Sequence, residues 1–146
     1  MRARAGVTAA ILALTALVLS ACSVRDPGAE SLETAIPAAL VASDLGITAS
    51  EAGSRVDGFS VNVWASAELE ADTLDAAGLR TMLQLVTDNV DLSDVNTLSI
   101  TASVGPVGSD TDYIDLGALG AELGFDDEGD TRFSAPWDDV VDFLGE

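Results

Sequence analysis

The side chains that could carry chemistry in this chain are carboxylates, hydroxyls and arginines, because it contains no lysine, no histidine and a single cysteine. These absences exclude a Ser-His-Asp triad, a Schiff-base lysine, a phosphate-loop lysine and histidine metal ligands. The segment Gly58–Asn62 reads G-F-S-V-N, which is not the G-x-S-x-G of a nucleophile elbow. No phosphate-binding glycine loop occurs, so we expect no cofactor.

Paired carboxylates could still hydrolyse a glycosidic bond, since the chain has 25 Asp and Glu residues. These acids fall mainly in expected loops and helix caps, and no segment sets two of them across a cleft. We therefore expect a non-enzymatic protein with no catalytic residues, and a carboxylate-dependent hydrolase stays as an alternative.

The acidic run of residues 126–130 invites a calcium interpretation through Asp126, Glu128 and Asp130, because hard cations favour clustered carboxylates. Its spacing departs from an EF-hand loop, since Thr131 follows where the pattern should continue. A solvated acidic loop is the expectation and no metal is assigned. A cation-binding or structural cell-envelope protein remains the second functional alternative.

One aromatic residue stands out among hydroxyl and amide side chains. Trp64 alternates with apolar residues, as do its expected neighbours, which are Ser60, Asn62, Ser99 and Thr101. A flat ring surrounded by hydrogen-bonding groups is typical of a sugar or peptide contact surface. The competing interpretation is that a loop, the C-terminal helix or the tether covers Trp64.

The N-terminus has the pattern of a secretory signal. Arg2 and Arg4 precede a stretch without charge that continues to Cys22, and its apolar core, residues 7–19, is shorter than the ~20 residues of a spanning helix. A signal peptide over residues 1–21 is therefore the expectation.

The boundary Leu19-Ser20-Ala21-Cys22 resembles the lipobox of bacterial lipoproteins. The resemblance implies that signal peptidase II recognises Leu19, Ser20 and Ala21, that the Cys22 thiol receives a diacylglyceryl group, and that cleavage occurs just before it. The alternative is an ordinary secretory signal beside a cysteine. As the only cysteine, Cys22 has no disulfide partner, which favours acylation. The chain also resembles small lipoproteins of high-GC Gram-positive bacteria, anchored on the outer face of the cell membrane.

The charge limits the partners. The formal net charge is −19 and becomes two units more negative when Arg2 and Arg4 are removed. Nucleic acid and anionic headgroups would be repelled, because binding phosphate depends on Lys or Arg. We expect membrane attachment only through the lipid on Cys22, no nucleic-acid partner, and a protein, peptide or glycan ligand.

Behind a tether at residues 22–34 we expect one acidic domain, residues 35–146. The fold class is α/β (α+β): a two-layer sandwich in which a three-stranded sheet carries helices on one face, in the order α-β-β-α-β-α-α. We expect Thr73 and Ser134 to cap helices. Asp57-Gly58 is expected to form a type I′ hairpin turn. Residues 132–134 could add an edge strand to the sheet. The expected helices are 36–45, 73–89, 112–123 and 134–144, and the expected strands lie within 47–56, 59–68 and 97–104.

Overall fold

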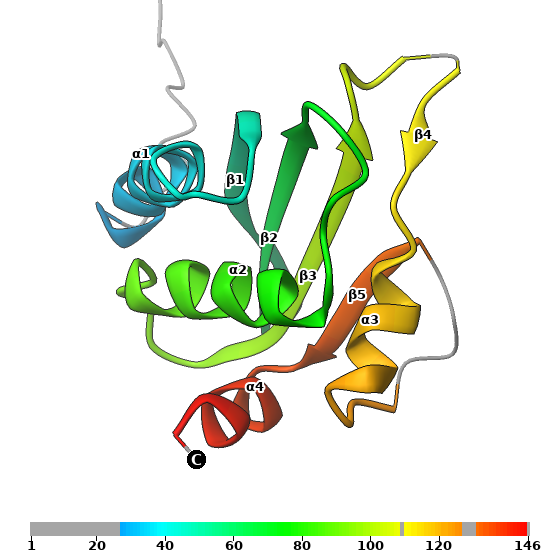
Figure 1. Ribbon diagram of the computed structural model, residues 1–146. Helices are drawn as coiled ribbons and strands as arrows, with labels where there is room; N and C mark the ends of the chain where they lie inside the picture. Colours follow the sequence, from blue (N-terminus) through cyan, green and yellow to red (C-terminus); the bar gives the residue numbers. More distant parts are fainter. Residues whose placement is uncertain (1–26, 109, 127–130, 146) are drawn as a thin grey trace, which may run out of the picture.

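The computed structural model describes residues 27–108, 110–126 and 131–145. These residues form an α+β fold of four helices and a five-stranded mixed open sheet (Figure 1). In chain order the elements are α1 (Pro27–Val41), β1 (Ile47–Asp57), β2 (Ser60–Leu69), α2 (Ala76–Asp88), β3 (Val95–Val104), β4 (Asp112–Tyr113), α3 (Leu116–Glu122), β5 (Arg132–Pro136) and α4 (Trp137–Leu144).

The sheet combines one hairpin, one crossover and two short edge strands. β1 pairs antiparallel with β2, and β2 pairs parallel with β3 through the crossover helix α2. Along its other side, β3 pairs antiparallel with β5 at Thr97–Thr101 and with β4 at Ser103 and Val104. The sheet therefore has two strands more than the expected three: the possible edge strand at residues 132–134 is confirmed as β5, and β4 was not expected. The short β4 and β5 depend on pairing with β3, and a single strand's own pattern does not reveal such pairing.

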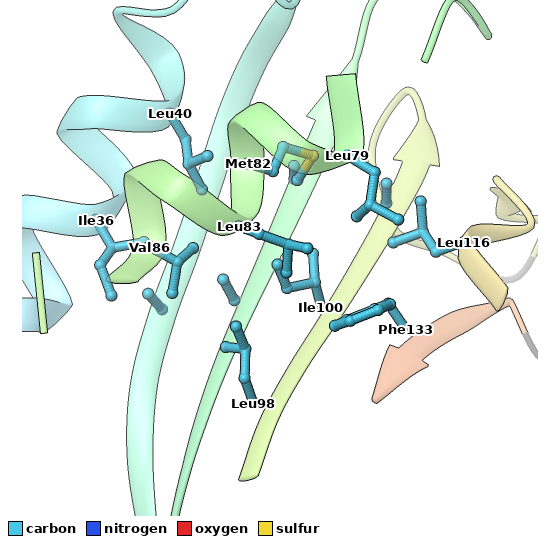
Figure 2. Close-up of a cluster of buried hydrophobic side chains, with 14 of the residues drawn as sticks. Ile36, Leu40, Leu79, Met82, Leu83, Val86, Leu98, Ile100, Leu116 and Phe133 are labelled. Atoms are coloured by element: carbon cyan, nitrogen blue, oxygen red, sulfur yellow. The ribbon is translucent and has the colours of Figure 1, made fainter. Parts of the chain in front are cut away.

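The helices and the inward side chains of the strands enclose one core. In Figure 1, α2 lies across one face of the sheet, with α1 beside β1 and with α3 and α4 on the β5 side. Figure 2 shows how side chains from these elements meet between the layers. The labelled members, all fully buried, are Ile36, Leu40, Leu79, Met82, Leu83, Val86, Leu98, Ile100, Leu116 and Phe133.

The β1–β2 turn differs from the expected type I′ turn at Asp57-Gly58. Asp57, the last residue of β1, pairs with Ser60, the first residue of β2, so the turn consists of Gly58 and Phe59. Gly58 has φ +63°, and Phe59 is not among the residues of positive φ. Positive φ at the first central residue alone is the pattern of a type II′ turn. Phe59, expected to point inward, is instead fully exposed at the hairpin tip.

The first helix begins earlier than expected. Residues 27–34 were assigned to a tether, yet they form the first turns of α1, and Leu32 is completely buried in the core. Pro37, the second residue of the helix expected over 36–45, lies inside α1. Leu32, expected in the tether, therefore packs with the core residues of the domain. Residues 22–26 fall outside the described part.

Three helix starts also differ from the sequence prediction. Asp75, not Thr73, caps α2, and its Oδ1 accepts from the Gly78 N–H at 2.8 Å. The third helix begins only after Asp115, whose Oδ1 accepts from Ala118 N–H, because Asp112 and Tyr113 extend as β4.

The C-terminal helix lacks the expected serine cap. Ser134 lies within β5, and α4 begins at Trp137 directly after Pro136, which makes no side-chain cap hydrogen bond. The pairing of β5 with β3 holds Ser134 extended, and a residue in a strand ladder is not available as a helix cap.

Candidate functional site

The face of the sheet turned away from α2 carries aligned rows of side chains. Because paired residues lie opposite one another and side chains alternate, each row runs across the strands. The rows are Arg55–Asn62–Thr97–Pro136, Gly53–Trp64–Ser99–Ser134, Glu51–Ser66–Thr101–Arg132, and Ala49–Glu68–Ser103–Tyr113. Within the described residues, α2 packs on the opposite face, whereas α1 flanks β1, where its Glu33 and Pro37 line a hollow together with Trp64.

Trp64 lies near the middle of this face and is 40% exposed. Its indole leans over Gly53, the residue paired with it on β1. A Cβ at Gly53 would lie 2.8 Å from Cζ2 of the indole and 2.9 Å from Nε1, so only glycine leaves room for the ring. The described residues do not confirm the interpretation that a loop, the C-terminal helix or the tether covers Trp64: its ring rests on β1, and the residue keeps part of its surface exposed beside Glu33 and Pro37 of α1.

A hollow of about 490 Å³ opens beside the indole. That volume lies within the ~300–1,000 Å³ of small-molecule sites. Its lining side chains on this face are Arg55, Asn62, Trp64, Thr97, Ser99, Thr101 and Arg132. Four of the five residues expected to form a ligand surface therefore come together here. The fifth, Ser60, lies beside Asp57 at the end of the sheet and does not line the hollow.

Hydrogen bonds order the polar floor of the hollow. The Thr97 hydroxyl donates to Oδ1 of Asn62, and the hydroxyls of Ser99 and Ser134 are 3.2 Å apart. Asn62 lines the hollow, and its amide nitrogen remains able to donate while its oxygen accepts from Thr97. The floor can therefore donate hydrogen bonds to a ligand without rearrangement.

Two arginines of the hollow were missed by sequence reasoning. Arg55 projects from β1 and Arg132 from β5. The two strands lie at opposite edges of the sheet, and both side chains are on the same face. Alternation along β1 puts Arg55 on the same face as Gly53, which is a usable signal. The position of Arg132 depends on the β3–β5 pairing, which joins residues more than 30 positions apart in the sequence.

A second hollow, of about 710 Å³, continues along the same face and shares Thr101 and Arg132 with the first. It is lined by two carboxylates, Glu51 and Glu68, and by the half-exposed Tyr113. The charges on this face are therefore mixed: Arg55 and Arg132 line the hollow beside Trp64, Glu51 and Glu68 line the second hollow, and Glu33 and Glu51 line another one that Trp64 also borders.

The acidic residues considered for a metal do not form a site in the described chain. Asp126 lines a different hollow with Asp139 and Asp142, next to α4. Within residues 27–108, 110–126 and 131–145, no group of three His, Cys, Asp or Glu side chains is arranged to hold a metal ion. Glu128 and Asp130 lie outside the described residues, as do Leu19, Ser20, Ala21 and Cys22 of the expected processing site.

Comparison of the chain with known proteins found no related protein. A scan against protein-family models found no match, and searches of curated proteins and of solved structures found none. None of the helices in the described segments is both long and apolar enough to span a bilayer.

Proposed function

We propose that this protein is a lipid-anchored, extracytoplasmic binding protein that takes its ligand on the sheet face around Trp64. The observation that carries the binding proposal is the seating of an exposed indole over Gly53, beside a hollow rich in hydrogen-bond donors. Exposed aromatic rings flanked by polar groups are enriched where proteins bind other molecules, since one side chain offers apolar area and a polar tip.

The composition of the two sheet faces supports this proposal. The inward face of β2 and β3 is fully committed to the core through Val63, Leu98 and Ile100. The outward face repeats small hydroxyl residues, and the large Trp64 interrupts them at the point where its strand partner is glycine. A plain solvated face needs no such pairing of the largest side chain with the smallest.

The anchoring part of the proposal rests on the boundary Leu19-Ser20-Ala21-Cys22. The core-packed helix α1 begins at Pro27, five residues after Cys22. Five residues span at most about 18 Å, so a lipid on Cys22 would keep the domain close to the membrane surface. A diacyl group supplies two chains, which is the number that stable anchoring generally takes.

Two measurements test the proposal separately. Mass spectrometry of the protein from its native membrane should show a terminus at Cys22 carrying a diacylglyceryl mass, and Cys22→Ser should release the protein from the membrane. An unmodified thiol or another terminus would contradict the anchoring.

For binding, envelope extracts are passed over immobilised wild type, Trp64→Ala and Phe59→Ala. Phe59 is a matched control because it is an exposed aromatic residue at the hairpin tip, away from the hollow. We expect Trp64→Ala alone to lose the retained ligand. Equal retention by all three would contradict the role of this face.

A further inference from the structure

We propose that the hollow beside Trp64 recognises an acidic saccharide, with the sugar ring against the indole and its carboxylates held by Arg132 and Arg55. This inference rests on the proposed binding function and names the class of ligand for the same site.

The distribution of positive charge is the first argument. The described residues contain three arginines on a chain of net charge −19, and two of them, Arg55 and Arg132, line this one hollow. The third, Arg80, lies over the ring of Phe143 at 4.7 Å and is engaged there. No ion pair within the described residues occupies Arg55 or Arg132. Within the described residues, the two guanidinium groups without an ion pair or ring contact therefore both line the hollow beside Trp64.

The balance of hydrogen-bond donors and acceptors in the hollow is the second argument for an anionic ligand. The oxygen of Asn62 already accepts from Thr97 while its amide nitrogen can still donate, and the guanidinium groups have donors only. The hydroxyls of Ser99 and Thr101 can donate or accept. Among the described residues, no carboxylate lines this hollow, whereas Glu51 and Glu68 line one neighbouring hollow and Glu33 and Glu51 line another. A ligand rich in acceptors is complementary to such a site, and a carboxylate fits a guanidinium bidentately.

The placement of the arginines favours an extended ligand. Arg55 and Arg132 project from strands three positions apart in the sheet, about 14 Å across at the usual strand spacing, and from rows four residues apart along the strands, about 13 Å, with Trp64 between them. A single carboxylate can contact both guanidinium groups only if both arginine side chains extend fully toward each other. A short chain of sugars with an acid on successive units can place one carboxylate at each.

A saccharide fits this surface better than a peptide strand. The floor of the hollow is formed by β2 and β3, whose backbone groups are already paired with strands on both sides. A peptide therefore cannot add to the sheet here through main-chain hydrogen bonds, which supply the affinity in strand addition. Recognition here therefore has to use side chains. The Trp64 indole, surrounded by hydrogen-bond donors, can pack against the face of a sugar ring while the donors bind its hydroxyl groups.

The test compares one saccharide in charged and neutral form. The anchored protein in detergent is titrated with tetragalacturonate and with its methyl ester, while the ¹H–¹⁵N signal of the Trp64 indole is followed. Trp137→Phe assigns that signal, since Trp64 and Trp137 are the two tryptophans. The titration uses about 0.15 M salt, where the Debye length of ~8 Å screens the distant carboxylates.

We expect the acid to shift the Trp64 signal saturably and to bind at least about tenfold more tightly than the ester, since a charge-assisted hydrogen bond is worth ~1.5–3 kcal/mol. Arg132→Gln and Arg55→Gln should each weaken binding of the acid several-fold. Arg80→Gln, which removes a guanidinium outside the hollow, should leave it unchanged. Thermal melts of each variant confirm that it is folded.

The outcomes separate this inference from the binding proposal itself. Equal binding of acid and ester, or arginine variants that bind as wild type, would overturn the acidic class while Trp64-dependent binding stands. Saturable binding of a pentaglutamate peptide without binding of the saccharide would also overturn it. No shift with any probe, together with equal retention of envelope ligands by wild type and Trp64→Ala, would overturn both.

Discussion

Trp64 and Gly53 face each other across the β1–β2 hairpin, and the glycine leaves the space that the indole fills. Glycine normally weakens a strand, because it loses more backbone entropy than other residues and offers no side chain to pack. Here the ring of Trp64 covers the bare backbone, so Gly53 is buried although it lies on the open face. An aromatic residue placed beside a strand glycine in this way compensates for the missing side chain. The pair thus fixes the direction of the indole and the location of the hollow.

Gly53→Ala should displace the indole, because a Cβ at this position would lie within 2.9 Å of three ring atoms. We expect destabilisation of about 1–3 kcal/mol from overpacking, measured by chemical denaturation. In a Trp64→Ala background the same substitution should cost little, since the clash is absent. A double-mutant cycle showing no coupling between the two sites would contradict the contact.

Phe133→Ala should destabilise the fold by about 3–5 kcal/mol, since the side chain is completely buried and its ring packs edge-on against Phe125 at 5.0 Å. Phe59→Ala is the matched control: the same atoms are removed from a fully exposed side chain, and the free energy of unfolding should change by less than about 0.5 kcal/mol. Similar losses for both variants would be inconsistent with β5 lying over the core.

Leu32→Ala should cost about 2–5 kcal/mol, because Leu32 is a core residue and not part of a tether. Thr34→Ala, two residues further along α1 at an exposed position, should change stability by less than about 0.5 kcal/mol. Thermal and urea unfolding of both variants measure the difference. If Leu32→Ala proved as neutral as Thr34→Ala, the packing of α1 against the core through Leu32 would be contradicted.

Asp75→Ala should destabilise the protein by about 1 kcal/mol, because it leaves the N–H of Gly78 without its carboxylate partner. Thr73→Ala removes the residue that the sequence suggests as the cap, and it should have little effect since Thr73 lies outside α2. The urea concentrations at the unfolding midpoints of the two variants distinguish the two capping residues. A larger loss of stability in Thr73→Ala than in Asp75→Ala would contradict the structure.

The sequence alone predicted the elements whose pattern is local. Strands β2 and β3 show strict alternation of apolar and polar residues, and the structure confirms both, with Val63 and Leu98 inward and Trp64 and Ser99 outward. The helix ending at Asn89 is confirmed in the same way by its helical spacing of buried residues. Such patterns are set by neighbours within a few positions, so they can be read without the rest of the chain. The processing site at Cys22 is also a local pattern, and it stays a prediction.

The tertiary structure decided what depends on distant partners. Whether residues 112–113 and 132–136 became strands or helix was settled by the exposed edge of β3, which supplies their hydrogen bonds. The same pairing carried Arg132 to the hollow of Trp64, and the β1–β2 register put Gly53 under the indole. Composition could show that arginines are scarce and that one tryptophan stands among hydroxyls. Only strand pairing, which joins residues far apart in sequence, could bring the two arginines and that ring to one surface.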